Sequence, residues 1–317
     1  MLHCFYKKRV ESLFAFLLVL LACLPVQARA EMIKRNFPAG YSIGRIYTFD
    51  SADAPMTGKD HFVGEARGTV LLPKSQPVYL IPDDQLFEHP ERLDTIDPDI
   101  FEGFSAGAKG IIIPIEKLLP HIAHLTGLRR LRLAGCDVTD EQVAVLAPLK
   151  KLQFLNLEAN ELNGSCLQSF MSMKELRTLD LTFTALRPTT FAELTKFPGL
   201  ELLKVGRCGV TDKTMADIGK LTRLKLLYLD GSHISARGLV CLNALKQLQV
   251  LSLRGCPLTP KDVMLLKISK LTLIMLPGGG YSAETMTALR KSFPGCKFWL
   301  GKQEPDDKIR TYFSPLH

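Results

Sequence analysis

The sequence lacks several short motifs on which metal and nucleotide sites are commonly built. It contains no C-x-x-C pair, no zinc-ligand spacing and no G-x-x-x-x-G-K-[ST] phosphate-binding loop. His121 and His124 lie three residues apart, but no third metal ligand accompanies them. We therefore expect a protein that is not an enzyme and that needs neither a metal nor a cofactor.

Only the first residues contain a long apolar run. Lys7–Arg9 is a short positive segment, residues 12–24 are apolar, and Ala28–Ala30 forms an A-x-A motif. This order predicts a secretory signal peptide at residues 1–30, cleaved after that motif, and a periplasmic or secreted mature protein. The alternative is a lipobox ending at Cys23, whose lipidation would tether the mature chain to a membrane. No later segment is long and apolar enough to span a bilayer.

Charge is unevenly distributed along the chain. The 40 basic and 32 acidic residues give a formal charge of +8. Residues 31–100 hold 7 basic and 12 acidic side chains (−5), whereas residues 101–317 hold 29 basic and 19 acidic ones (+10). This asymmetry could favour an anionic partner, could hold the two parts together, or could be an ordinary soluble surface. We expect no nucleic-acid ligand.

One pattern, Leu-x-x-Leu-x-x-Leu-x-Leu, recurs every 24 residues, and a small or polar residue follows each copy. The first copy begins at Leu125, and the seventh begins one residue early at Ile268. Such a period predicts a stack of repeats, because no single unit could bury its own leucines. The small or polar position is occupied in turn by Cys136, Asn160, Thr184, Cys208, Ser232, Cys256 and Gly279.

Each copy predicts a strand, a turn and a helix. Leu131–Leu133 alternates apolar and polar residues, which is typical of a strand with its leucines facing inward. Thr139 is the expected N-cap of the helix, Gln142 is its capping-box partner, and Val143 and Leu146 are its expected buried positions. The same pattern predicts N-caps at Thr211, Ser235 and Thr259.

These motifs resemble leucine-rich repeats of the ribonuclease-inhibitor-like, cysteine-containing type, in the 24-residue form common in bacteria. The phrase from Leu131 to Asp140 is similar to the repeat signature, and the end at residues 293–300 is similar to the usual last strand. The resemblance implies an α/β solenoid, with parallel strands on the concave face, helices on the convex face, and a macromolecule bound on the concave sheet. The expected divisions are a β-rich cap at 31–100, a solenoid at 101–300 with a degenerate capping repeat at 101–124, and a polar tail at 301–317.

Six cysteines follow the predicted signal peptide. An even number in an exported chain suggests disulfides, but Cys136, Cys208 and Cys256 share one position in repeats one, four and six. Residues two strands apart in a sheet are separated by about 10 Å, which is too far for a disulfide. Cys166 and Cys241 are three repeats apart. We therefore expect buried thiols.

The outward positions of the strands are the expected contact surface. The first outward position of each strand is the residue directly before the strand's first inward leucine. From repeat four onward this position is mostly apolar, which predicts an exposed apolar stripe on the concave sheet. The primary hypothesis is a monomeric protein–protein interaction module. The alternative is an envelope-associated structural protein whose basic solenoid binds anionic glycans or lipid headgroups. The predicted contact residues are Phe154, Leu202, Leu226, Tyr228, Val250 and Arg254.

Overall fold

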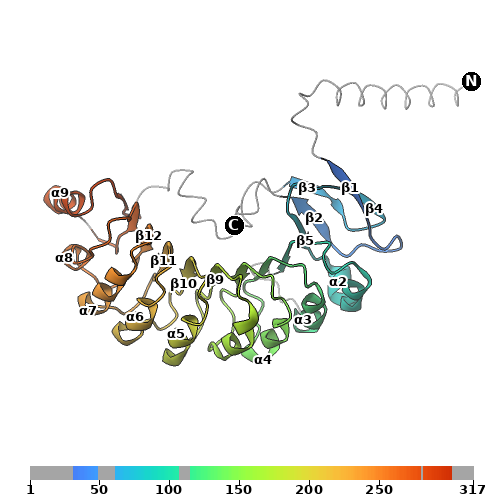
Figure 1. Cartoon of the computed structure of the whole chain (residues 1–317), viewed down its shortest axis with the longest axis horizontal. Coiled ribbons are helices and arrows are strands. Elements are labelled where there is room, and N and C mark those ends of the chain that lie inside the picture. The colour runs from blue at the N-terminus through green and yellow to red at the C-terminus, as the bar shows by residue number, and fades with distance from the viewer. Residues whose placement is uncertain (1–30, 49–60, 107–114, 280, 302–317) are drawn as a thin grey trace, which may run out of the picture.

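The chain forms a curved solenoid with strands along the inner edge of the arc and helices along the outer edge (Figure 1). The computed structural model describes residues 31–48, 61–106, 115–279 and 281–301. The predicted signal peptide and all but the first residue of the predicted tail lie outside these residues. The predicted α/β solenoid is confirmed.

Within the described residues, twelve strands form one sheet in the order β14-β13-β12-β11-β10-β9-β8-β7-β6-β5-β2-β3. From β5 to β14, every neighbouring pair is parallel. The solenoid strands are β6 (Gly103–Ala106), β7 (Arg130–Leu133), β8 (Phe154–Asn156), β9 (Thr178–Asp180), β10 (Leu202–Lys204), β11 (Leu226–Tyr228), β12 (Val250–Ser252), β13 (Leu273–Met275) and β14 (Lys297–Trp299).

Short helices cover the outer side of the arc. The segments Asp140–Val143 and Ala236–Leu239 each continue as a 3-10 turn. The helical segments are α3 (Ile115–His124), α4 (Asp140–Val143) with η3 (Ala144–Leu146), η4 (Ser165–Ser172), α5 (Pro188–Leu194), α6 (Asp212–Ile218), α7 (Ala236–Leu239) with η5 (Val240–Ala244), α8 (Pro260–Val263) and α9 (Ala283–Ser292). Within the described part of the chain, none of the helices has the length and apolarity needed to cross a membrane.

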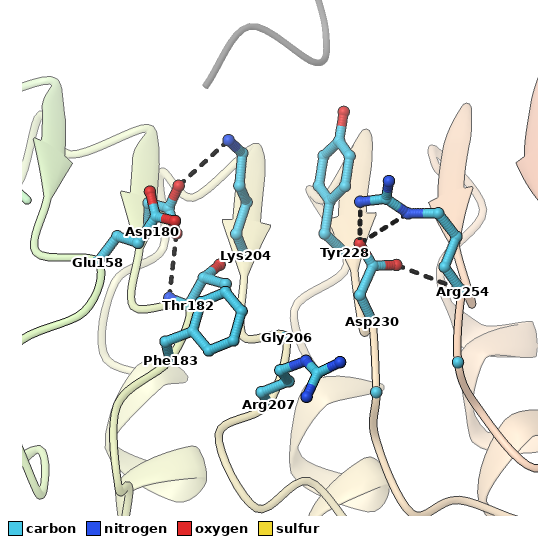
Figure 2. Close-up of a pocket in the computed structure, with 12 residues that line it drawn as sticks. Glu158, Asp180, Thr182, Phe183, Lys204, Gly206, Arg207, Tyr228, Asp230 and Arg254 are labelled. Carbon is cyan, nitrogen blue, oxygen red and sulfur yellow. Dashed lines mark hydrogen bonds and ion pairs between the residues drawn. The ribbon is translucent and has the colours of Figure 1, made fainter. Parts of the chain in front are cut away.

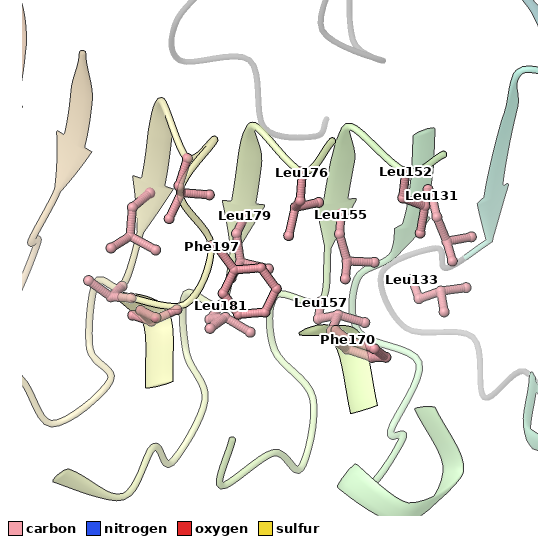
Figure 3. Close-up of a cluster of buried hydrophobic side chains, with 14 of the residues drawn as sticks. Leu131, Leu133, Leu152, Leu155, Leu157, Phe170, Leu176, Leu179, Leu181 and Phe197 are labelled. Atoms are coloured by element: carbon pink, nitrogen blue, oxygen red, sulfur yellow. The ribbon is translucent and has the colours of Figure 1, made fainter. Parts of the chain in front are cut away.

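The core is a ladder of leucines that repeats from strand to strand (Figure 3). Leu131 pairs with Leu155, and Leu155 with Leu179; all three side chains are fully buried. The partners differ by 24 in residue number, so each leucine lies on its counterpart in the next repeat. Burying one such side chain contributes about 1.5–3 kcal/mol, and the ladder therefore stabilises the stack only as a whole.

The helix caps follow the predicted local chemistry. The backbone N–H of Gln142 donates to Thr139 Oγ1 (3.4 Å), and the backbone N–H of Thr139 donates to Gln142 Oε1 (2.8 Å), which confirms the capping box. Val143 and Leu146 are fully buried, as predicted. These bonds satisfy N–H groups that a helix start would otherwise leave unpaired.

A buried polar position joins each turn to the next repeat. Asn160 Oδ1 accepts the N–H groups of Cys136 (3.0 Å) and Val138 (3.2 Å), and its Nδ2 donates to the carbonyl oxygens of Leu133 (2.7 Å) and Leu157 (2.9 Å). At the same position in later repeats, the side chains of Thr184, Cys208 and Cys256 bond to carbonyl oxygens of the turns.

The six cysteines of the described residues are free thiols. Burial raises the pKa of Cys136 to about 12 and that of Cys256 to about 11. Thiols with such pKa values stay protonated and serve as small apolar groups with one weak donor.

The N-terminal elements extend the solenoid sheet. Strand β5 (Val78–Ile81) pairs in parallel with β6, while β2 (Arg45–Thr48) lies antiparallel between β5 and β3 (His61–Glu65). The remaining elements are β1 (Met32–Asn36), which pairs with β4 (Thr69–Pro73), and the short helices α2 (Asp84–Glu88) and η2 (Pro90–Thr95).

The junction between the two parts depends on a glycine. Gly103 in β6 lies opposite Tyr79 in β5, and a Cβ on Gly103 would lie 1.9 Å from the Tyr79 ring. The sequence of residues 101–124 matches only the helical half of a repeat. The structure also has a strand, β6, in this segment. The boundary predicted at residue 100 stays a prediction, since one hydrophobic core runs from Phe37 to Cys296.

Candidate binding site on the concave sheet

The six predicted contact residues lie on the inner strands or directly after them. Phe154 begins β8, Leu202 begins β10, and Leu226 begins β11. These three side chains are half-buried. Tyr228 ends β11, Val250 begins β12, and Arg254 follows β12 in the turn. Whether these residues contact a partner stays a prediction.

The predicted exposed apolar stripe is wrong for part of this set. Tyr228 is 5% exposed and Val250 is 3% exposed. Together with Leu273 and Met275 they form a separate buried group, here called the concave apolar cluster, against which Leu202, Leu226 and Trp299 pack. Large side chains on strands about 4.8 Å apart shield one another laterally, which alternation in the sequence does not reveal.

A hollow of about 350 Å³ opens where β9, β10, β11 and β12 end (Figure 2). Two cation–carboxylate pairs stand in its wall. Lys204 Nζ lies 3.1 Å from Asp180 Oδ2 and 5.5 Å from the centre of the Tyr228 ring. Arg254 Nη2 lies 2.5 Å from Asp230 Oδ2, and its Nε lies 3.0 Å from the same oxygen.

The two carboxylates in the wall have structural roles. Asp180 is 2% exposed, and its Oδ1 accepts the Thr182 N–H (3.0 Å) at the turn after β9. Asp230 Oδ1 accepts the Arg254 N–H (3.2 Å) from the neighbouring repeat and the Ser252 hydroxyl. The two carboxylates thus hold the turns and orient the two cations.

Two side chains project from this wall at backbone positions that favour glycine. Phe183 has a φ of 60° and Arg207 a φ of 55°, both in the left-handed region. Phe183 is 54% exposed, and the Arg207 guanidinium carbon lies 5.4 Å from the centre of its ring (Figure 2). We call this pair the Phe183–Arg207 rim.

The rim could have been found by comparing repeats at one position. In successive repeats, the residue directly before the buried polar position (the position of Asn160) has a φ in the left-handed region. The rim residues are therefore retained despite strain of about 1–2 kcal/mol each, which points to a use for their side chains. In order, this position is occupied by Gly135, Ala159, Phe183, Arg207, Gly231 and Gly255.

Relief of this strain should be measurable as a gain in stability. Phe183→Gly and Ala159→Gly are each expected to raise the free energy of unfolding by about 0.5–1 kcal/mol, because glycine adopts a positive φ without a Cβ clash. Urea unfolding followed by circular dichroism measures the change. A loss of stability in both variants would contradict the assignment of strain at this position.

Cations also line the strands before the hollow. Arg130 and Arg132 lie on β7, and the Arg130 guanidinium carbon is 5.7 Å from the centre of the Phe154 ring. Burial is the largest influence on Arg132 and lowers its pKa, while the nearby Glu158 carboxylate opposes that shift. Guanidinium groups thus lie over aromatic rings at three places along the concave face, Arg130–Phe154, Arg207–Phe183 and Arg254–Trp299.

One hydrolase-like motif, G-x-S-x-G, occurs at Gly40–Gly44. It leads into strand β2 and is not the strand-to-helix elbow that exposes a nucleophilic serine in α/β hydrolases. The Ser42 hydroxyl bonds within its own turn, to the Gly44 carbonyl oxygen (3.2 Å) and N–H (3.1 Å). Ser42 therefore stabilises a turn here.

The two histidines noted in the sequence do not share a site. His121 Nδ1 lies 2.9 Å from Asp94 Oδ2, which joins helix α3 to the N-terminal elements. Across the described residues, no group of three or more His, Cys, Asp and Glu side chains is placed to hold a metal ion.

Comparisons with known proteins bear on the fold. No protein family model matches the sequence, and no curated protein matches it significantly. Among solved structures, an internalin C2 (inlC2) from Listeria monocytogenes str. 4b F2365 is similar at 19% identity and a TM-score of 0.50, covering 69% of this chain and 93% of that one. This likeness supports the solenoid fold.

A second solved structure, an internalin (inlF) from the same organism, shares 20% identity with a TM-score of 0.47. The similarity covers 66% of this chain and 62% of that chain. The chain thus matches less than two thirds of the length of that internalin.

Proposed function

We propose that the chain is an exported, non-enzymatic leucine-rich repeat protein that binds a protein partner on its concave face. The Phe183–Arg207 rim is the centre of the binding site. The observation that carries this proposal is an exposed aromatic ring held at a strained backbone position beside a guanidinium group. Nothing in the fold requires either side chain there, since glycine occupies the equivalent position in other repeats.

The chemistry of the rim defines what the partner offers. Aromatic and arginine side chains contribute disproportionately to protein–protein binding energy. Among the described residues, no carboxylate forms an ion pair with Arg207. We therefore propose that the partner places an apolar side chain against Phe183 and a carboxylate against Arg207.

The surrounding wall supports this site by rigidity. Asp180 holds Lys204, and Asp230 holds Arg254, so both cations are oriented before a partner arrives. Pre-oriented side chains lose less conformational entropy on binding. The predicted contact Arg254 lines the same hollow as the rim and belongs to the proposed site.

Three finer points belong to the same proposal. Export rests on the charged and apolar order of residues 1–30, with the lipobox at Cys23 as the alternative anchor. The mature protein would act in the periplasm or outside the cell. The ribonuclease-inhibitor-like repeat type is supported by the buried thiols of Cys136, Cys208 and Cys256 at a shared position.

A matched pair of variants tests the site. Full chains starting at Glu31, with the wild-type sequence, with Phe183→Gly plus Arg207→Gly, or with Ala159→Gly, are immobilised and exposed to envelope extract. A partner retained by the wild type is purified, and its affinity is measured by calorimetry. The rim variant should bind about 30-fold more weakly, a loss of about 2 kcal/mol, because it lacks both anchors.

The Ala159→Gly variant controls for the backbone change, because it alters the same position in the adjacent repeat without removing a large side chain. It should bind as the wild type does. Equal affinity of the rim variant and the wild type would place the site elsewhere. Affinity that collapses between about 50 and about 500 mM salt, regardless of the rim, would favour the glycan or lipid alternative.

A further inference from the structure

We propose that the partner protein grips the Phe183–Arg207 rim from both sides, and that one of its loops enters a second hollow beyond the rim with a basic side chain against Glu161. This inference rests on the proposed function and extends it from the concave side of the rim to the opposite side. Two observations support it: the second hollow itself, and an exchange of large and small residues in the turns that form the rim.

The second hollow, here called the lateral hollow, has a volume of about 750 Å³ and is lined by residues 160–163, 183–186 and 207–209. Phe183 and Arg207 line this hollow as well as the hollow in Figure 2. Most of the first hollow is formed by residues at the ends of the strands, whereas the lateral hollow is formed by the rim and by residues that follow the rim position in each turn. The rim is therefore a ridge between two hollows.

The turns of repeats three and four exchange a large and a small residue relative to other repeats. Each turn has three positions in sequence: the rim position, the buried polar position and the residue after it. The small residue comes first and a larger one third in repeats one, two, five and six, which read Gly-Cys-Asp (135–137), Ala-Asn-Glu (159–161), Gly-Ser-His (231–233) and Gly-Cys-Pro (255–257). The order is reversed in repeats three and four, which read Phe-Thr-Ala (183–185) and Arg-Cys-Gly (207–209). The same two repeats thus raise the rim and open the lateral hollow.

The backbone does not require this exchange. Gly135 and Asp137 of repeat one have φ angles of 62° and 53°. Arg207 and Gly209 of repeat four have φ angles of 55° and 73°. The two turns therefore share a pair of left-handed angles around a central cysteine, yet glycine stands first in one turn and third in the other. Because the same backbone holds either arrangement, the projecting side chain and the adjacent space at repeat four are explained by a ligand that uses both.

The accessible side chains of the lateral hollow define its occupant. Glu161 of repeat two and Arg207 of repeat four are both exposed, and Ala185 of the repeat between them has no long side chain to fill the space. Among the described residues, no cation forms an ion pair with Glu161. A partner loop with one basic and one acidic side chain would therefore complement Glu161 and Arg207 together. Hollows of several hundred Å³ accept more than one side chain, which favours a loop over a single residue.

Selection of peptide loops tests the proposal with a defined probe. A phage-displayed library of short disulfide-closed loops is selected on the immobilised wild-type chain starting at Glu31, and the affinity of each enriched loop is measured by calorimetry. Enriched loops should contain Lys or Arg together with an acid. Glu161→Gln, a change of one exposed side chain, should weaken their binding about fivefold, because the basic side chain loses its carboxylate.

A filled variant tests the use of the lateral hollow directly. Ala185→Gln with Gly209→Asn places neutral relatives of the larger residues of repeats two and one at the third turn position and leaves the rim unchanged. It should weaken binding about tenfold or more, because the loop can no longer enter. His233→Asn, at the same turn position in repeat five and outside the hollow, should bind as the wild type does. Far-UV circular dichroism should be the same for all variants.

The rim variant, Phe183→Gly with Arg207→Gly, separates this proposal from the proposed function. Weaker binding to both the rim variant and the filled variant supports a grip from both sides. Weaker binding to the rim variant alone would overturn the two-sided grip and leave the proposed function intact, whereas weaker binding to the filled variant alone would show that the rim is not needed. Wild-type affinity for both variants, or a library from which no loop is enriched, would overturn both proposals.

Discussion

Replacing Asn160 with alanine is expected to lower the free energy of unfolding by about 4–5 kcal/mol, because several buried backbone groups lose their partner at about 1–3 kcal/mol each. The Asn160 side chain accepts from two N–H groups of repeat one and donates to the Leu133 and Leu157 carbonyl oxygens. It therefore ties two repeats together at 6% exposure, where water cannot replace it. Urea unfolding followed by circular dichroism measures the loss.

Two further variants provide controls at the same structural position. Thr184→Ala removes the bond to the Leu181 carbonyl oxygen (2.6 Å) and should cost about 1–2 kcal/mol. Asn160→Cys should be intermediate, because Cys208 and Cys256 already donate to a neighbouring repeat from this position. If Asn160→Ala lowered the free energy of unfolding no more than Thr184→Ala does, the several hydrogen bonds of Asn160 would not stabilise the fold together.

Asp140→Asn is expected to be the second most destabilising change, at about 2–3 kcal/mol near neutral pH. Asp140 is 3% exposed, and its carboxylate accepts the N–H groups of Asn163 (2.7 Å), Gly164 (3.0 Å) and Cys166 (2.9 Å) in the next repeat. An amide can accept from only one of the two oxygen positions, so at least one N–H loses its partner.

The effect of Asp140 should depend on pH with a defined sign. Burial is the largest single influence and would raise the pKa of Asp140, but the bonds from Cys166, Asn163 and Gly164 together lower it. A lowered pKa stabilises the fold above the unfolded-state value of about 3.9 and is lost as pH falls through the folded value. The difference between wild type and Asp140→Asn should therefore be constant from about pH 6 to 8 and shrink below about pH 4.

Asp212, the equivalent residue three repeats later, provides the matched control. Its pKa is also lowered, mainly by hydrogen bonds from the Ser235 side chain and backbone, but it is more exposed. Asp212→Asn should destabilise the chain less than Asp140→Asn. Equal losses, or a loss for Asp140→Asn that grows as the pH falls, would contradict the assigned role of the buried carboxylate.

The repeat pattern was sufficient to predict the parts of the fold that depend on local periodicity. Leu131, Thr139 and Val143 were assigned as strand, cap and buried helix residues, and the structure confirms all three assignments. Such positions are predictable because each obeys a short-range rule of spacing or hydrogen bonding. Strand β6 was not predicted, because its buried residues, including Phe104, fall outside the leucine pattern.

The surface was predicted less well, because exposure depends on the side chains that neighbouring strands place beside a residue. Val250 was predicted to be exposed from its outward position, yet it is buried in the concave apolar cluster. Phe183 was missed because it lies in a turn between periodic segments. Its significance follows from a backbone angle that one repeat alone does not disclose.

By itself, the sequence determined that the chain is a stack of strand–turn–helix units, since a strict period leaves the leucines only one way to be buried together. The tertiary structure decided which outward residues are accessible and which backbone positions are strained. Exposure arises from the side chains of neighbouring repeats, and the strained angles belong to a turn position that is recognised only when several repeats are compared. No rule of local spacing encodes them.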